Sequence, residues 1–258
     1  MLFVIDVGNT NIVLGIYKGD HLLENWRIGT KRGRTVDEYG ILVKELLSFS
    51  NIDSREITDI IISSVVPPLD STLTSMSEKY FAIKPMIVGQ GLKSGIPILY
   101  ENPKEVGADR IVNAVAALKR FGGPIIVVDF GTATTFDLIT KKGEYSGGVI
   151  APGIGISVEA LFQRASKLPR IDLVKPKKVI GRNTVNSIQS GIIHGYVSLV
   201  DGIVLKMKEE AGVEAKVIAT GGLASLIAKE SRFIDEVVPN LTLEGLKEIF
   251  DINKRGES

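Results

Sequence analysis

The sequence of 258 residues contains no cysteine and only two histidines, His21 and His194. Without cysteine, the chain can form no disulfide, no thiolate nucleophile and no cysteine-ligated zinc or iron–sulfur site. Because the two histidines lie far apart in the sequence, we expect neither a histidine-rich metal site nor a histidine-based catalytic triad. The residue types left for chemistry are carboxylates, hydroxyls, backbone amides and basic groups, which are the groups that phosphoryl transfer uses.

The sequence also lacks an excess of charge of either sign. Lysine plus arginine is 31 and aspartate plus glutamate is 30, so the formal charge is +1. Nucleic-acid-binding proteins usually carry a basic excess, and membrane-surface proteins carry a polybasic patch or an amphipathic anchor. The first apolar run is interrupted at Asp6, and no run approaches the roughly 18 apolar residues of a spanning helix. We therefore expect a cytoplasmic protein with no nucleic-acid or membrane partner.

A pattern of strands and turns occurs twice. An apolar run ends in an Asp-x-Gly turn at Asp6 to Gly8 and again at Asp129 to Gly131. A second strand, a tight turn, a third strand and a helix follow each one, and an offset of 123 residues pairs Lys18 with Lys141. Such a repeat predicts a duplicated α/β domain with a mixed sheet of about five strands in each half and a ligand cleft between the halves. The expected halves are residues 1–116 and 117–258.

Hydrophobic periodicity predicts the remaining elements. Further strands are expected at 57–66, 86–88 and 216–219, and helices at 69–80, 107–121, 155–166 and 185–211, with two more from 223 and 243. Pro67 and Pro68 are expected to end the 57–66 strand. The 89–106 segment has little periodicity, and long loops in compact domains are often functional.

The first turn, Asp6-Val7-Gly8-Asn9-Thr10-Asn11, is suited to binding an anion. Glycine allows close approach of the backbone, and successive N–H groups in such a turn can surround a phosphate. The alternative is an ordinary β-hairpin, in which asparagine and glycine are the usual turn residues. The chain has no Walker-type P-loop, and Gly153-Ile154-Gly155 is not completed to a dinucleotide motif because residue 158 is valine.

Four motifs occur in a characteristic order. They are Asp6 to Asn11, Gly107-Ala108-Asp109-Arg110, Asp129 to Thr135, and Gly147-Gly148 with Pro152-Gly153. The two Asp-x-Gly turns resemble the phosphate loops of the actin-like ATPase superfamily, whose domains have a ribonuclease H-like fold. Together the four motifs resemble the type III pantothenate kinase family from residue 3 to about residue 223. That resemblance implies ATP-dependent phosphorylation of pantothenate to 4′-phosphopantothenate, the first step of coenzyme A biosynthesis.

The resemblance also implies ligands and residue roles. The family uses ATP with Mg²⁺, requires a monovalent cation such as potassium or ammonium, and is homodimeric. The implied ATP-binding residues are Asp6, Val7, Gly8, Asn9, Thr10, Asn11, Ile12, Val13 and Thr132. The implied pantothenate-binding residues are Tyr100, Gly107, Ala108, Asp109, Arg110 and Thr184. Asp109 would act as the base toward the attacking hydroxyl, and Asp129 would bind the monovalent cation.

Each implied role has a structural alternative. Asp109 could be a first-turn carboxylate favoured by the helix dipole, and Arg110 could form a surface salt bridge. Tyr100 could pack over a core edge, Thr184 could be a simple N-cap, and Asp129 could hold Mg²⁺ through water.

Two further features have open interpretations. Thr220-Gly221-Gly222 after a strand resembles the adenosine-contacting turn of the superfamily, or it is a helix N-cap turn without a ligand. The apolar stripe of the 185–211 helix is too wide for a surface helix, so this helix is either deeply buried or half of a subunit interface. His194 is expected within that stripe and His21 on a surface strand.

Two other functions remain possible from the sequence. One is a different small-molecule kinase of the actin-like superfamily, such as a sugar kinase. The other is a non-catalytic nucleotide-binding relative that regulates transcription, although the charge of +1 gives no support for DNA contact.

Overall fold

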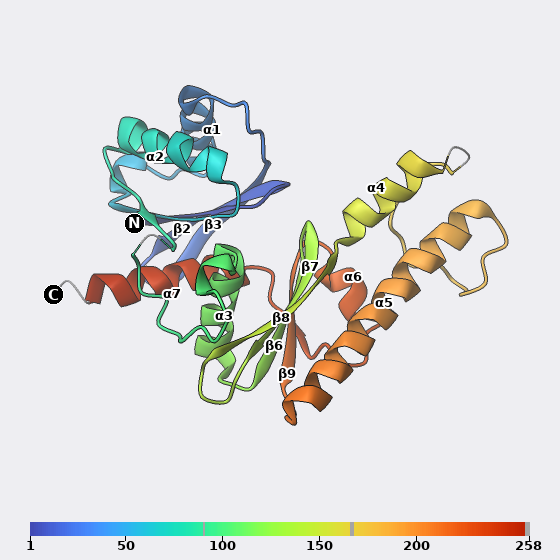
Figure 1. Ribbon diagram of the computed structural model, residues 1–258. Helices are drawn as coiled ribbons and strands as arrows, with labels where there is room; N and C mark the ends of the chain where they lie inside the picture. The colour runs from blue at the N-terminus through green and yellow to red at the C-terminus, as the bar shows by residue number, and fades with distance from the viewer. Residues whose placement is uncertain (90, 166–167, 256–258) are drawn as a thin grey trace. The chain divides into compact units, whose positions relative to one another are not determined.

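The computed structural model describes residues 1–89, 91–165 and 168–255, which form two compact units. The first unit comprises Met1–Lys119 with Leu241–Ser258, and the second comprises Arg120–Asn240. Each unit contains a five-stranded mixed sheet with helices (Figure 1). The expected class, a duplicated α/β fold with about five strands in each half, is therefore confirmed.

The sheet of the first unit has the order β3-β2-β1-β4-β5. Its strands are β1 (Leu2–Val7), β2 (Asn11–Lys18), β3 (His21–Gly29), β4 (Asp59–Ser64) and β5 (Met86–Ile87). Strand β1 pairs antiparallel with β2 and parallel with β4. The helices of this unit are α1 (Val36–Phe49), α2 (Pro67–Phe81), α3 (Ala108–Phe121) and α7 (Leu241–Arg255), with short 3₁₀ turns at Ser54–Glu56 and Pro103–Glu105. His21 is exposed, as expected.

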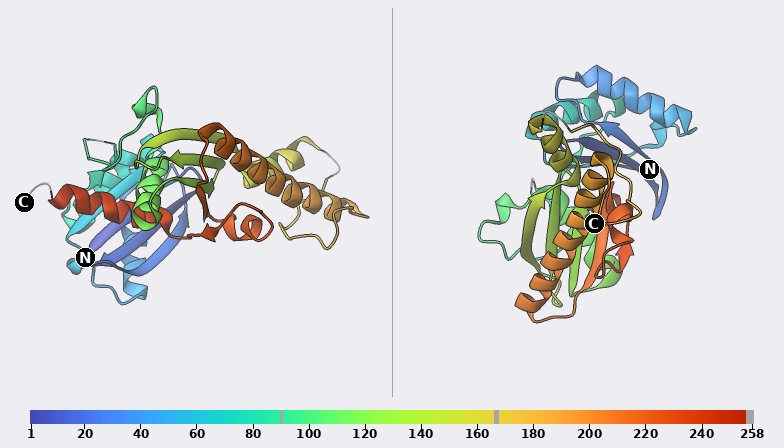
Figure 2. Two further views of the ribbon diagram at one scale, coloured as in Figure 1. Left: turned by 90° about the horizontal axis from the view of Figure 1, so that it is seen from below. Right: turned by 90° about the vertical axis from the view of Figure 1, so that its right-hand side faces the viewer.

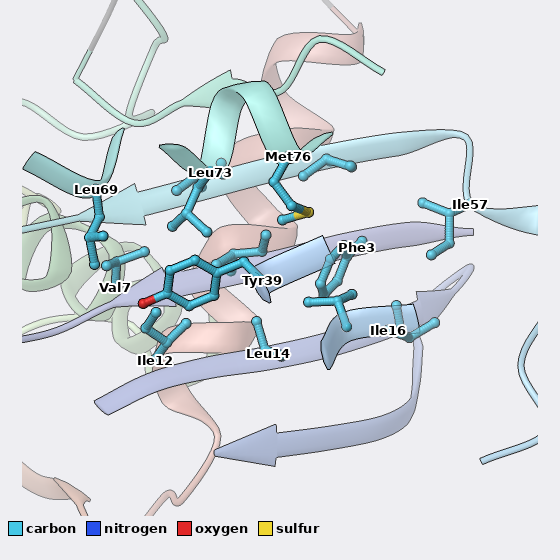
Figure 3. Packing of buried hydrophobic residues seen from close by; sticks show 14 of the residues in the cluster. Phe3, Val7, Ile12, Leu14, Ile16, Tyr39, Ile57, Leu69, Leu73 and Met76 are labelled. Carbon is cyan, nitrogen blue, oxygen red and sulfur yellow. The ribbon is translucent and has the colours of Figure 1, made fainter. Parts of the chain in front are cut away.

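The side chains of β1 alternate between two apolar layers. Phe3 and Val7 belong to the core shared with α1 and α2, where Figure 3 shows them with the ring of Tyr39. Val4 points to the other face, because a methyl group on Gly15 would meet Val4 and Leu243 of α7 at 3.0 Å. Burial on both faces requires the nearly continuous apolar run that this strand has.

The sheet of the second unit repeats the arrangement with the order β10-β9-β6-β7-β8. Its strands are β6 (Ile125–Phe130), β7 (Ala133–Ile139), β8 (Tyr145–Pro152), β9 (Lys216–Gly221) and β10 (Glu236–Val237). The helices are α4 (Ile154–Arg164), α5 (Thr184–Ala211) and α6 (Ala224–Ala228). Side chains of all three helices share a core with one face of the sheet, and α4 lies beside α5 in Figures 1 and 2.

The last helix is placed differently from the expectation. Residues 241–258 were expected in the second half, but α7 packs with β1, β2 and β4 of the first unit. A methyl group on Gly245 would overlap the carbonyl oxygen of Val112 in α3, and Lys254 Nζ lies 2.9 Å from Asp59 Oδ1. The apolar face of β1 that α1 and α2 leave uncovered explains this placement, because a strand buried on both faces needs a second layer.

The expected end of the fourth strand was also wrong. Strand β4 ends at Ser64, and Pro67 and Pro68 lie in the first turn of α2. Proline suits that position because the first helical N–H groups have no partner within the helix.

Helix α5 is long and apolar enough to cross a membrane by length and composition alone, although polar residues such as Gln189, His194 and Asp201 interrupt its apolar runs. One third of its most apolar window is buried, so it is not deeply buried. Ile193, Val200 and Val204 are fully buried in the second core. The hydroxyls of Tyr196 and Ser157 are hydrogen-bonded to each other at 2.6 Å. A helix that packs on a protein core has the same apolar composition as a membrane-spanning segment, so composition is weak evidence for a membrane span here.

Candidate active site

The first candidate phosphate loop consists of residues 8–10 between β1 and β2. The N–H of Gly8 donates to the carbonyl oxygen of Asn11 at 3.0 Å and closes the turn. A methyl group on Gly8 would lie 3.0 Å from the same oxygen, so the close approach favours glycine. Asn9 and Thr10 are exposed, and Asp6 is half-buried at the end of β1 beside Val13. The loop therefore presents amide and hydroxyl groups to solvent at a fixed sheet edge.

The segment that follows β3 holds this loop. Thr30 donates its N–H to Thr10 O at 3.0 Å and its hydroxyl to Gly8 O at 2.6 Å. Arg32 Nη2 donates to Asn9 Oδ1 at 3.1 Å. These contacts were not expected from the sequence, because they join residues about 20 positions apart through a loop without a recognisable motif.

The Gly107-Ala108-Asp109-Arg110 motif forms the start of α3. Asp109 Oδ1 accepts the N–H of Arg110 at 2.8 Å, and a methyl group on Gly107 would lie 2.6 Å from that oxygen. The same methyl would lie 3.6 Å from Val65 Cγ1, and the Val65 N–H donates to Val7 O at 3.0 Å. The Asp109 carboxylate therefore lies at the sheet edge where β1 ends and the first loop begins.

Arg110 is only 7% exposed. The alternative of a surface salt bridge is therefore excluded for this residue. A buried guanidinium needs hydrogen-bonding partners, and its planar fork suits carboxylate or phosphate oxygens.

Tyr100 lies half-buried in the long segment between β5 and α3. This segment is attached to α7, since Lys93 N–H donates to Asn253 Oδ1 and Asn253 Nδ2 donates to Lys93 O, both at 3.0 Å. Helix α7 thus restrains the loop that carries Tyr100, while the contact of Tyr100 with substrate stays a prediction.

The second candidate loop, residues 131 and 132 between β6 and β7, is shorter than the first. Gly131 N–H donates to Ala133 O at 3.0 Å. Asp6 pairs with Val13 across its hairpin, whereas Asp129 pairs with Thr135, so the offset between the copies falls from 123 to 122 after the loop. The expected pairing of Lys18 with Lys141 was therefore wrong by one residue.

The second loop is held from the end of β8. The N–H of Gly153 donates to Thr132 O at 3.1 Å. A methyl group on Gly153 would overlap Thr132 O and lie 2.6 Å from Gly131 O. Gly153 thus permits a close approach that any side chain would prevent, although its φ of −74° suits every residue type.

Asp129 lies beside the Thr220-Gly221-Gly222 turn. Gly221 has a φ of +93°, and a methyl group there would lie 2.7 Å from Asp129 Oδ1 and 2.6 Å from Phe130 O. Helix α6 begins later and has Leu223 as its N-cap, so the turn is not the N-cap itself. In the described parts of the chain, no group of three or more histidine, aspartate and glutamate side chains could hold a metal. Asp129 offers one carboxylate next to a carbonyl oxygen, a donor set that fits a hard cation.

Thr184 is the first residue of α5 and lines a hollow of about 710 Å³ within the second unit. The N-cap is Asn183, whose Oδ1 accepts the Asn186 N–H at 2.8 Å, so the N-cap alternative for Thr184 was wrong. The other lining residues are Leu161, Leu168, Gly181, Arg182, Asn183, Ser187, Ile188, Gly191 and Ile192. Leu161 is about 10 Å along α4 from Ile154, at ~1.5 Å per residue, so the hollow and the second loop lie toward opposite ends of that helix.

The family model and the sequence relatives indicate the same family. A family model described as type III pantothenate kinase matches residues 2–206. A type III pantothenate kinase from Myxococcus xanthus (strain DK1622) is 58% identical over 253 residues, covering 98% of this chain and 99% of the relative.

Solved structures with lower identity share the fold. A protein assigned to the Baf family of transcriptional activators from Campylobacter jejuni has a TM-score of 0.62 at 18% identity and covers 98% of this chain, with 99% of its own chain covered. A protein described as a 2-dehydro-3-deoxygalactonokinase from Sinorhizobium meliloti has a TM-score of 0.60 at 12% identity, with 98% and 96% covered. At such identities the likeness concerns the fold alone.

We predict that Gly153→Ala destabilises the second unit by about 1–3 kcal/mol, because the added methyl overlaps a loop carbonyl. Gly155→Ala is the matched control, since a methyl there meets no atom within 4 Å and alanine favours the helix. Urea unfolding of both variants measures the difference. Equal stability of the two variants would contradict the close approach at Gly153.

Proposed function

This chain belongs to the type III pantothenate kinase family and phosphorylates pantothenate in coenzyme A biosynthesis, and we propose how its residues carry out that transfer. The observation that carries the proposal is the position of the Asp109 carboxylate at the sheet edge where the first loop begins. A base and a phosphate-binding loop at the same end of one sheet can act together, the base on the attacking hydroxyl and the loop on the phosphates of ATP.

The first loop binds the phosphates of ATP. Residues 6–13 supply backbone N–H groups, the Asn9 amide and the Thr10 hydroxyl, and Thr132 of the second loop adds a further ATP contact. The divalent metal that accompanies ATP in this family would offset the charge of the phosphates. The Asp6 carboxylate, near the end of β1, would hold that ion through water.

Asp109 acts as the base. The pantothenate hydroxyl oxygen bonds to the γ-phosphorus while the bond from that phosphorus to the β,γ-bridging oxygen breaks, so ADP leaves. The hydroxyl proton passes to the Asp109 carboxylate. In a loose transition state, positioning contributes more than basicity. The restraint of Asp109 Oδ1 by the Arg110 N–H at 2.8 Å supports this role.

The substrate contacts come from three places in the chain. Arg110 pairs with an oxyanion of pantothenate or of the transferred group, consistent with its burial at the start of α3. Gly107, Ala108 and Tyr100 contribute further contacts. Thr184 binds pantothenate from the hollow at the start of α5, which offers polar and apolar surface to a small amide with one carboxylate.

Asp129 would bind a monovalent cation, either potassium or ammonium. Its carboxylate and Phe130 O lie next to the same Gly221 position, and oxygen donors of this kind suit a hard, weakly charged ion. A bound cation there would add positive charge near the second loop.

The enzyme works as a homodimer in the cytoplasm. Most large apolar side chains that are exposed among the described residues belong to β8, α4, α5 and the segment between α4 and α5, including Ile150 at 61% and Ile180 at 83%. A second copy of the chain would cover this surface, since patches of this kind mark interaction sites.

We predict that Asp109→Asn lowers turnover by at least about 10²-fold, because the amide cannot take the hydroxyl proton. ATP binding should persist, since the first loop is unchanged. A coupled assay for ADP, with pantothenate, Mg²⁺ and potassium, measures turnover, and a potassium-free arm tests the cation. Unchanged turnover of the variant would remove Asp109 from the mechanism, and wild-type protein without pantothenate-dependent ADP release would contradict the whole proposal.

We predict that Thr184→Ala raises the KM for pantothenate about tenfold, through the loss of one hydrogen bond of about 1.4 kcal/mol. The KM for ATP should change less than twofold. Ser198→Ala is the control, because it removes a hydroxyl from an exposed position of the same helix outside the hollow. Equal effects of the two variants would contradict the role of Thr184.

We predict that the wild-type protein sediments at twice its chain mass of 27.9 kDa and that Ile180→Glu shifts it toward the monomer. A buried, unpaired carboxylate would oppose association. Phe49→Glu is the control, because Phe49 of α1 is 85% exposed but lies in the first unit. A monomeric wild type, or a dimer unaffected by Ile180→Glu, would overturn this assembly.

A further inference from the structure

We propose that Arg32 is a nucleotide-binding residue of this enzyme, which orients the Asn9 side chain and supplies positive charge to the phosphates of ATP. The inference rests on the proposed role of the first loop in phosphate binding. It extends the site beyond the loop itself, to the segment Lys31-Arg32-Gly33-Arg34 between β3 and α1.

The first loop needs a source of positive charge. Residues 6–13 include one carboxylate, Asp6, and no lysine or arginine. The chain as a whole carries only +1, so attraction for a polyphosphate has to arise locally. Residues 31–34 contain three basic side chains within four positions, and they follow Thr30, which is hydrogen-bonded to the loop.

The contact between Arg32 and Asn9 has a direct consequence for anion binding. Arg32 Nη2 donates to Asn9 Oδ1 at 3.1 Å, and both side chains are exposed. An amide has one oxygen, which accepts, and one nitrogen, which donates. Because Arg32 occupies the oxygen, the Asn9 amide nitrogen is left to donate to a phosphate oxygen. The guanidinium has five N–H donors, so it can bind a phosphate while it contacts Asn9.

The basic segment is held in place by α1. Tyr39 Oη donates to Lys31 O at 3.0 Å, and the Arg34 guanidinium lies 5.6 Å from the centre of the Tyr39 ring. Figure 3 shows the Tyr39 hydroxyl near Val7 and Ile12, which pair across the hairpin that carries the first loop. Because Thr30 is bonded to the first loop and Lys31 to α1, the backbone at Arg32 is already restrained, and less conformational entropy is lost when Arg32 binds a ligand.

The second unit shows that the basic segment is not required to close such a loop. Thr30 N–H bonds to Thr10 O after β3, and Gly153 N–H bonds to Thr132 O in the same way after β8. In the second unit α4 begins immediately at Ile154, and no basic residue intervenes. The hydrogen bond after the third strand therefore holds each loop, whereas Arg32 is an addition found at the first loop alone.

The test is the steady-state kinetics of Arg32→Ala and Arg32→Lys, with direct titration of MgATP by calorimetry. We expect Arg32→Ala to raise both the KM and the Kd for ATP about tenfold, the loss of one charge-assisted hydrogen bond, with the KM for pantothenate changed less than twofold. Arg32→Lys keeps the charge and should recover part of the loss. In an Asn9→Ala background, Arg32→Ala should have a smaller effect, because part of its action passes through Asn9.

Arg55→Ala is the matched control. Arg55 is an exposed arginine of the same unit that pairs with Asp53 at 2.7 Å, and it precedes β4, at the sheet edge opposite the first loop. A KM and a Kd for ATP in Arg32→Ala within twofold of those in Arg55→Ala would overturn the proposal, as would equal losses for both substrates. If the wild type binds ATP but does not phosphorylate pantothenate, the proposed function fails while the titration still decides the role of Arg32. If the wild type binds no ATP, both proposals fail.

Discussion

The burial of one central strand in each sheet is the constraint on which both candidate loops depend. In β1 and β6 the first four residues are buried, the fifth is a half-buried aspartate, and the sixth is buried again. If such a strand slid by one residue, its aspartate would move to a fully buried position, where an uncompensated carboxylate is costly. The register that buries the core therefore also fixes where Asp6 and Asp129 lie and where each loop begins.

A second constraint acts on the far side of each loop. The residue after the third strand donates its N–H to the last carbonyl of the loop in both units. Backbone hydrogen bonds thus close both loops, and such bonds form with any side chain. The exceptions are positions where a side chain would overlap a neighbouring carbonyl oxygen. Gly8 and Gly153 are such positions, and this explains why glycine appears in motifs whose other members carry the chemistry.

The repeated pattern could be predicted from the sequence because it depends on local signals: apolar runs, Asp-x-Gly turns and helical periodicity. The errors concern interactions that local patterns do not encode. The position of α7 depends on an uncovered face of β1, and Pro67 is compatible both with a strand end and with a helix start. The one-residue difference between the loops becomes visible only in the strand register. The contacts of Thr30 and Arg32 with the first loop join residues distant in the sequence. The Pro152-Gly153 motif, which follows the third strand of the second copy as Thr30 follows that of the first, was a usable signal for the Thr30 contact.

The two loops differ in the charge that their surroundings offer, and the difference suits two kinds of ligand. The longer first loop has amide and hydroxyl groups and lies next to arginine, so its surroundings favour an anion. The shorter second loop has Asp129 and a backbone carbonyl beside Gly221, so its surroundings favour a cation. A duplicated fold supplies the same strand ends twice, and the side chains around each loop then separate their roles. Because the total charge is only +1, this separation cannot come from the field of the whole molecule and has to be built from contacts within a few ångströms of each loop.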